Sequence, residues 1–134
     1  MILFPDSAAT YALDQWVDQR ATWYHLFQLP IELDHTTALS DFGEVVFAGY
    51  SAEDVSTWTN ATLFRGVATT WGDPLLWTCL VDPVPVAVIR GYYVTDGPTG
   101  PLLWCEMAPE ATTIDTAGQQ VAVQPRLQWG ALPS

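Results

Sequence analysis

The feature that most constrains the fold of this chain is a succession of short apolar runs separated by glycine or proline. From residue 21 onward the sequence is rich in Val, Thr, Trp, Tyr and Phe, and a turn-forming Gly or Pro recurs about every ten residues. Such residues favour strands, and this spacing is typical of antiparallel sandwiches and barrels. We therefore expect a mainly β, antiparallel β-sandwich in a jelly-roll or an immunoglobulin-like order. The expected strands are residues 22–28, 44–48, 63–70, 75–81, 86–95, 102–107 and 120–129.

The clearest alternation of apolar and polar residues lies in segment 120–129. Its apolar positions are Val121, Val123, Pro125, Leu127 and Trp129. Successive side chains of a strand point to opposite faces, so one face of this segment is apolar and the other is polar and faces solvent. Pro125 has no N–H for a sheet ladder, which predicts an edge strand or a bulge.

One short helix is expected near the N-terminus. The residues at helical spacing are Ala9, Leu13, Trp16, Val17 and Arg20, within segment 8–20. Ser7 is a suitable N-cap. Residues 1–20 then form an apolar arm and this helix, residues 21–134 form the sandwich, and the whole chain 1–134 is one domain.

The segment "RGYYVTDGPTGPLLWCE", residues 90–106, predicts a hairpin with its turn at "DGPTG". Counting outward from that turn, with Thr95 opposite Pro101, places Arg90 opposite Glu106 and Tyr92 opposite Trp104. Gly91 then lies beside Cys105 and leaves space for its thiol. Cross-strand pairs of this kind contribute about 0.2–1 kcal/mol each. We therefore interpret the Arg90 and Glu106 pair as structural rather than catalytic.

The charge balance excludes several classes of partner. The chain has 15 acidic residues, four Arg and no Lys, giving a net charge of -11. Phosphate binding depends on clustered cations, so we expect no nucleic acid and no membrane as partners. We see no basic signal-peptide region and no apolar run of about 18 residues, which predicts a soluble chain that is not exported. Seven Trp and a hydrophobic share of 49% predict spare apolar surface for a protein partner.

Residues suited to catalysis are few. The absence of Lys excludes Schiff-base and P-loop chemistry. His25 is expected to be a strand residue with a satisfied ring. Glu32, Asp34 and His35 could be drawn as a metal site, but their spacing fits no ligand pattern. We expect no catalytic residues, no metal and no cofactor.

Other residues leave alternatives open. Cys79 and Cys105 are either buried free thiols or one inter-strand disulfide. Trp104 and Trp129 are expected to pack in the core. Trp71, in the turn "TTWGDP", is expected to be exposed, as Trp is at protein interfaces and on sugar-binding platforms. The apolar arm containing Ile2, Leu3 and Phe4 either folds onto its own domain or docks on a neighbour.

The order of several motifs resembles a group of small virion proteins from tailed phages and environmental viruses. The motifs here are "FPDS" with "ALDQWV", then "WYHLFQ", then "ALSDFGEVVFAGY" followed by "STWT", then the hairpin. The group has a strand reading like "LYLALF", an "LADFTEAxFxGY" segment and a "YGYFVTDxxGxLLWAE" hairpin, so the similarity covers nearly the whole chain. This chain departs in "LPIELDH", in Trp71, and in Cys105 where the group often has Ala.

The resemblance implies a β-sandwich with a structural role in the virion, and it carries over no catalytic residue. We expect a non-enzymatic capsid decoration or cement protein, located in the virion and bound to the major capsid protein or other virion proteins. It would act as a homo-oligomer or in many copies, docking through Ile2, Leu3, Phe4 and Trp71. The alternative is a receptor- or glycan-binding module on a tail or capsid spike that uses the same Trp. An enzyme is the third hypothesis.

Overall fold

The computed structural model describes residues 6–64 and 66–129, and it is mainly β with one α-helix, as expected. The elements are α1 Asp6–Asp18, β1 Thr22–Phe27, the 3-10 turn η1 Leu39–Asp41, β2 Glu53–Val55, β3 Thr62–Phe64, β4 Val67–Trp71, β5 Leu75–Thr78, β6 Ala87–Asp96, β7 Leu102–Ile114, β8 Gln120–Val123 and β9 Arg126–Trp129.

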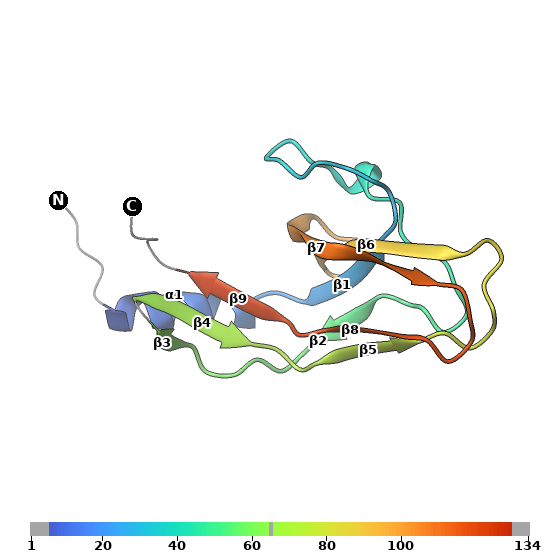
Figure 1. The fold of residues 1–134 in the computed structure, drawn as a ribbon. Helices are drawn as coiled ribbons and strands as arrows, with labels where there is room; N and C mark the ends of the chain where they lie inside the picture. Colours follow the sequence, from blue (N-terminus) through green and yellow to red (C-terminus); the bar gives the residue numbers. More distant parts are fainter. Residues whose placement is uncertain (1–5, 65, 130–134) are drawn as a thin grey trace.

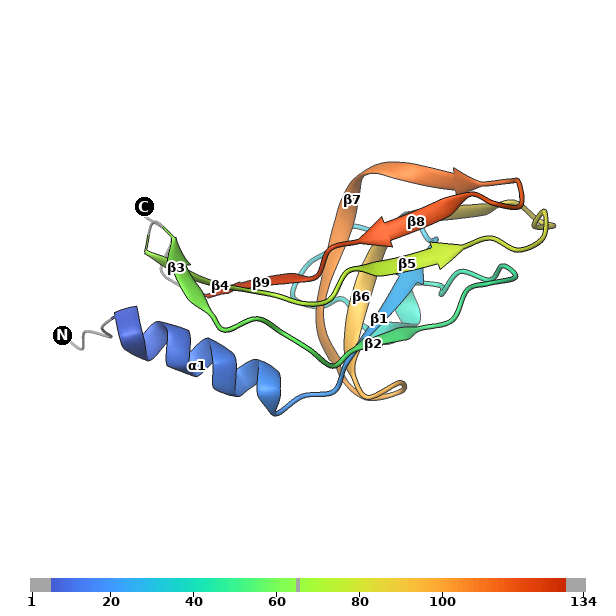
Figure 2. The same ribbon diagram turned by 90° about the horizontal axis from the view of Figure 1, so that it is seen from below.

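The strands form two facing layers (Figures 1 and 2). One layer is the antiparallel sheet β2-β1-β6-β7, and the other combines β3-β4-β9 with β5-β8. In the second layer β4 leads into β5 and β8 leads into β9. The Gly72 N–H donates to the Pro125 carbonyl at 3.0 Å and holds the two halves in register. The expected sandwich is confirmed, and the choice between a jelly-roll and an immunoglobulin-like order stays a prediction.

The main core lies between these layers. Tyr24, Leu26 and Val94 of the first sheet are buried against Leu75 and Trp77 of the second. The Trp77 indole N–H donates to the Ser51 carbonyl at 2.7 Å, so the largest buried side chain is also hydrogen-bonded. The core therefore joins the two layers into one body.

A second apolar cluster covers the opposite face of the first sheet. Phe27, Phe42 and Tyr93 are buried there, and the rings of Phe42 and Tyr93 stack at 4.4 Å. The predicted strand 44–48 follows Phe42 and is wrong, because only Glu44 forms a bridge, to Phe27, while Val45 and Phe47 are buried in the main core. Gly43 and Gly49, with φ of 65° and 99°, turn the chain at both ends of this segment.

Helix α1 packs on β3, β4 and β9. Leu13 and Val17 are buried against Ala68, which confirms the predicted apolar face. The predicted boundaries shift, because Ser7 lies inside the helix rather than at its N-cap. Arg20 follows the helix, and its guanidinium donates to the Trp16 carbonyl at 2.9 Å and lies 4.1 Å from the Trp16 ring.

Three predicted strands have different limits. The run 63–70 is divided into β3 and β4 by a turn at Gly66, whose φ is 77°. The run 75–81 ends at Thr78. The run 120–129 is divided into β8 and β9 at Pro125, and both strands lie at the edge of their sheets, as the missing proline N–H predicted. Its alternating burial is confirmed from residue 120 to residue 128. Strand β2 was not predicted, and β7 continues through Pro109.

The predicted hairpin register is wrong by two residues. Tyr92 lies opposite Glu106, and Gly91 lies opposite Met107. Next to the turn, Thr95 lies opposite Leu102, which is one residue beyond the predicted partner. A register shift between Val94 and Thr95 then moves the remaining pairs by one further residue. The other predicted pairings change as follows: Arg90 donates instead from Nε to the Gln28 carbonyl at 2.9 Å, Trp104 lies opposite Val94, and Cys105 lies opposite Tyr93.

Gly91 has a different role from the one predicted. A Cβ at this position would lie 2.3 Å from the Glu106 carbonyl oxygen and 2.7 Å from Cε1 of Phe27. The glycine therefore admits the Phe27 ring and the neighbouring strand, rather than making space for the Cys105 thiol.

Candidate functional site

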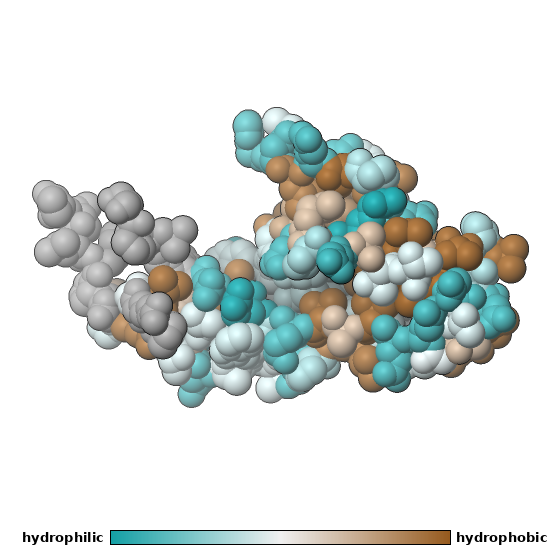
Figure 3. Space-filling model, in the orientation of Figure 1, coloured by the Kyte–Doolittle hydropathy of each residue, from teal (hydrophilic) through white to brown (hydrophobic). Residues whose placement is uncertain are grey.

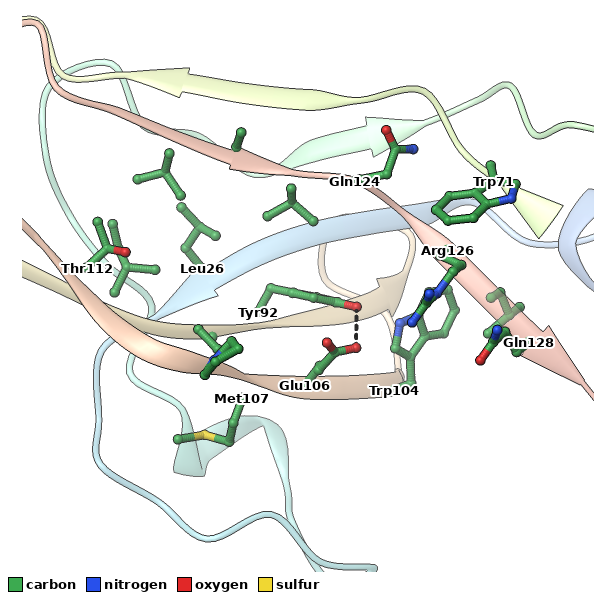
Figure 4. Close-up of a pocket in the computed structure, with 18 residues that line it drawn as sticks. Leu26, Trp71, Tyr92, Trp104, Glu106, Met107, Thr112, Gln124, Arg126 and Gln128 are labelled. Carbon is green, nitrogen blue, oxygen red and sulfur yellow. Dashed lines mark hydrogen bonds between the residues drawn. The ribbon is translucent and has the colours of Figure 1, made fainter. Parts of the chain in front are cut away.

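A groove of about 600 Å³ opens along one side of the sandwich, between β7 and the β8–β9 segment (Figure 4). Both are edge strands of their layers. The pairing of β7 with β6 shifts register between Ile89, which lies opposite Thr112, and Gly91, which lies opposite Met107. Residues 108–111 therefore bulge, and β7 bends so that its second half runs beside β8 (Figure 2). The groove lies along this bend.

The walls of the groove are aromatic and aliphatic. Trp71 comes from one layer, and Tyr92 and Trp104 come from the other. Tyr92 packs on the buried Tyr24 with ring centroids 5.2 Å apart, and Trp104 meets the same ring edge-on at 6.0 Å. Trp16 of α1 lies 5.9 Å from Trp104 on its other side. The aromatic side chains of the first layer are therefore held in place by packing.

Polar groups also face this space. The Tyr92 hydroxyl donates to Oε2 of Glu106 at 3.1 Å, a contact between direct cross-strand partners. Burial, with the Glu106 charge as the next cause, raises the pKa of Tyr92 to about 12. The Arg126 guanidinium lies 5.5 Å from the ring of Trp71, its cross-strand partner.

Part of this polar set has free hydrogen-bonding capacity. Gln124 Nε2 donates to the Gly72 carbonyl at 2.8 Å. By contrast, within the described part of the chain no hydrogen bond involves the Arg126 guanidinium or the side-chain amide of Gln128. The second carboxylate oxygen of Glu106 likewise has no partner among the described residues. A carboxylate, a guanidinium and an amide are thus available to a ligand.

A smaller hollow of about 280 Å³ continues from the groove toward α1. It shares Trp104, Leu127 and Gln128 with the groove. Its other lining residues are Leu13, Trp16 and Leu103. The open space therefore extends from the sandwich edge to the helix.

The predicted site residues have three outcomes. Trp71 is 42% exposed, as expected, and lies on the groove wall. The predicted interface residues Ile2, Leu3 and Phe4 lie outside the described residues. Trp104 packs against the core as expected while also lining the groove, and the Trp129 side chain is outside the description.

The histidine on β1 is satisfied at both ring nitrogens, as predicted. His25 Nδ1 lies 2.8 Å from Oε2 of Glu44, and Nε2 lies 2.9 Å from the Thr95 hydroxyl. This order of hydroxyl, imidazole and carboxylate is that of a catalytic triad. However, Thr95 is 1% exposed and donates its hydroxyl proton to the Gly97 carbonyl at 2.6 Å. That hydroxyl is accessible to no substrate in this conformation, and the cluster connects β1, β6 and residue 44.

The acidic loop before Thr36 forms a turn. Asp34 Oδ1 accepts hydrogen bonds from the Thr36 hydroxyl at 2.6 Å and from its backbone N–H at 2.8 Å, and these bonds hold the pKa of Asp34 below its usual range. Across residues 6–64 and 66–129, no three His, Cys, Asp or Glu side chains gather as a metal site.

The cysteines are both free thiols. Cys79 is buried and its Sγ donates to the Val81 carbonyl at 3.0 Å, whereas Cys105 is half-buried. Burial raises the pKa of the Cys105 thiol. Of the two alternatives the free thiols are confirmed.

A second surface feature lies at the end of the molecule opposite α1. The loop of residues 80–86, here called the apolar loop, connects β5 to β6 (Figure 1) and contributes hydrophobic surface at that end (Figure 3). Its exposed side chains are Leu80 (66%), Val81 (62%), Val84 (96%) and Val86 (47%). Hydrogen bonds hold the loop, since the Leu80 N–H donates to the Ala48 carbonyl at 2.8 Å and Asp82 accepts from the Ala117 N–H at 2.7 Å.

No family model matches the chain, and it matches neither a curated protein nor a solved structure. Within residues 6–64 and 66–129, no helix has the length and apolar character needed to cross a membrane.

Proposed function

We propose that this chain is a non-enzymatic structural protein of a phage virion that decorates the capsid by binding the major capsid protein or another virion protein. The resemblance of nearly the whole sequence to small phage virion proteins supports this role. The structural observation that carries it is the apolar loop, a hydrogen-bonded segment that presents four large aliphatic side chains to solvent.

The apolar loop has the properties of an interface. Val84 is 96% exposed, so its side chain contributes little to packing within this chain. Burying an exposed Val or Leu side chain against a partner is worth roughly 1.5–3 kcal/mol. Contiguous exposed aliphatic surface marks contact sites for proteins. Because hydrogen bonds already order the loop, docking costs less conformational entropy than it would for a mobile segment.

The rest of the molecule agrees with attachment to protein rather than to nucleic acid. The net charge of -11 and the absence of Lys oppose binding to phosphate backbones. A decoration protein present in many copies gains avidity, so each apolar loop needs only a modest interface.

The test is incorporation of variants into virions. Val84→Glu places a charge on the apolar loop at a position that packs against little, so the fold is retained. We expect at least about tenfold fewer copies per purified particle, counted by quantitative mass spectrometry, since about 1.4 kcal/mol of lost affinity gives that factor. Tyr11→Glu, at a 67% exposed position on α1, is the matched control and should leave the copy number unchanged.

Two results contradict the proposal. One is the absence of the wild-type protein from purified particles. The other is an equal copy number for Val84→Glu and wild type, which would remove the apolar loop from the interface.

A further inference from the structure

The groove has the size of a small-molecule site. Its volume of about 600 Å³ lies within the range of roughly 300–1,000 Å³ that ligand pockets occupy. Its lining combines a majority of apolar and aromatic side chains with a few polar ones, which is the usual composition of such sites. Neither the apolar loop nor the role in the virion accounts for it.

Two tryptophans lie at one end of the groove, with the Arg126 side chain drawn between them (Figure 4). Trp71 belongs to β4 and Trp104 to β7, so they approach from opposite layers. The face of an aromatic ring carries negative charge density and attracts the slightly positive C–H groups on the flat face of a sugar ring. Trp71 is stabilised by Arg126, and Trp104 by Trp16 and Tyr24, so both rings are held before a ligand arrives.

The polar groups beside the tryptophans match sugar hydroxyls. A hydroxyl both donates and accepts, and the site offers the acceptor Glu106, the donor Arg126 and the amide of Gln128, which does both. The charges of the Glu106 carboxylate and the Arg126 guanidinium cancel, so this set of polar groups has no net charge. The overall charge of -11 repels anionic ligands. The chemistry therefore favours a neutral ligand rich in hydroxyls.

A peptide strand fits the same opening poorly. Pro125 interrupts β8–β9 and Pro109 lies in β7, so each edge lacks an N–H for an added strand. The bulge at residues 108–111 and the inward-facing Glu106 further oppose strand pairing along β7.

We propose that the groove binds a neutral oligosaccharide, with Trp71 and Trp104 stacking on sugar rings and with Glu106, Arg126 and Gln128 bonding to hydroxyls. The site carries out no covalent chemistry. It is separate from the apolar loop, so saccharide binding and capsid attachment are independent properties of one chain.

The test is a titration of the full chain with neutral trisaccharides of glucose, galactose, mannose and N-acetylglucosamine, each up to about 10 mM, a range that detects weak sites. Sialyllactose serves as an anionic saccharide probe, and a strand-forming peptide serves as a probe for strand addition at the groove. Calorimetry gives the affinity, and the indole N–H resonances report on Trp71 and Trp104. We expect saturable binding of at least one neutral trisaccharide, with both indole resonances shifted and no binding of the other two probes.

Variants locate the site. Trp71→Ala and Arg126→Ala should each weaken binding at least about tenfold, which corresponds to ~1.4 kcal/mol. Glu106→Gln keeps the shape and should weaken binding by a smaller factor. The matched controls Tyr11→Ala, Arg90→Ala and Glu110→Gln lie outside the groove and should change the affinity less than about twofold. Val84→Glu should retain full saccharide binding even if it is lost from virions.

The proposal is overturned if no neutral trisaccharide binds, or if Trp71→Ala and Arg126→Ala bind as tightly as wild type. It is also overturned if sialyllactose or the peptide is the preferred probe. If none of the probes binds, Glu106 and Arg126 act instead as charged residues that protect the open edge from strand pairing.

Discussion

At the residue scale, two tyrosines form hydrogen bonds with glutamates but differ in what their hydroxyls satisfy. The Tyr50 hydroxyl donates to Glu44 and accepts from the Leu26 N–H at 3.1 Å, whereas the Tyr92 hydroxyl donates to the exposed Glu106 and satisfies no backbone group. Tyr50→Phe leaves a buried N–H without its partner, and it should lower the free energy of unfolding by about 1–3 kcal/mol.

The matched control for this first prediction is Tyr92→Phe. It removes contacts to side chains and leaves no backbone group without a partner, so it should cost less than about 1 kcal/mol. Urea unfolding followed by Trp fluorescence measures both variants. Equal losses would show that the bond to the Leu26 N–H contributes nothing.

The tyrosines also set the alkaline limit of stability. Burial, with the nearby Glu106 and Glu44 charges as the next cause, raises the pKa of Tyr92 and of Tyr93 to about 12, from an ordinary value of 10.0. Above pH 10 the unfolded chain has lost these protons and the folded chain keeps them, so unfolding releases protons. The contribution of these two tyrosines to the free energy of unfolding should therefore be constant below pH 10 and fall as the pH rises toward 12.

Unfolding by urea at a series of alkaline pH values tests this second prediction. Tyrosinate absorbance of the folded protein should appear later than that of the unfolded chain. Tyr93→Phe should make the loss of stability with pH less steep. A free energy of unfolding that rises between pH 10 and pH 12 would contradict the expected release of protons on unfolding.

Individual positions could be predicted where local chemistry decides them. The satisfied ring of His25, the exposure of Trp71 and the edge position of the strands that flank Pro125 all follow from residue type and neighbours. The groove residues Glu106 and Arg126 could not be predicted as a site. They are 20 positions apart in sequence and face one space only because β7 curves beside β9.

At the scale of elements, α1 depends on its buried face. Leu13 is 1% exposed and packs with Val17 against Ala68 of β4, and Asp14 Oδ1 accepts the Ala61 N–H at 2.8 Å. Leu13→Ala leaves a cavity between helix and sheet and should cost about 2–5 kcal/mol.

The exposed helix face supplies the control for this third prediction. Tyr11 is 67% exposed, so Tyr11→Ala should change the free energy of unfolding by less than about 0.5 kcal/mol. Thermal unfolding followed by circular dichroism measures both. If Leu13→Ala were as mild as Tyr11→Ala, the helix would contribute little to the stability of the sandwich.

The strand pattern shows how far local sequence determines elements. Strands β1 and β6 could be predicted because apolar runs and flanking turns coincide. The register of β6 and β7 could not, because a turn one residue longer and a shift beside Thr95 each move the pairing by one. The segment 44–48 has strand-forming residues, but left-handed Gly43 and Gly49 turn the chain at both ends, and apart from the bridge at Glu44 it forms no strand.

At the scale of the whole molecule, the features lie in separate places. Helix α1 is at one end, the apolar loop is at the other, and the groove is along the side between them (Figures 1 and 4). A particle could therefore hold the chain by its loop end while the groove stays accessible. The mainly β, two-layer body could be predicted from composition and turn spacing, whereas the open edge arises from the bulge in β7 and was not foreseen.

The charge of the whole chain gives the last prediction. With a net charge of -11, and with no ion pair between an Arg and a carboxylate among the described side chains, repulsion between acidic groups outweighs attraction. Salt screens both, so adding NaCl from about 0.05 M to about 0.5 M should stabilise the fold. The midpoint of thermal unfolding should rise by about 2–5 °C, equivalent to ~1 kcal/mol.

A charge variant separates this repulsion from a general salt effect. Glu110 is exposed on β7, and Glu110→Lys changes the net charge from -11 to -9, since one negative charge is lost and one positive charge is gained. The variant should melt at a higher temperature than wild type at low salt and gain less from added NaCl. A midpoint that falls with NaCl would mean that attractive pairs dominate.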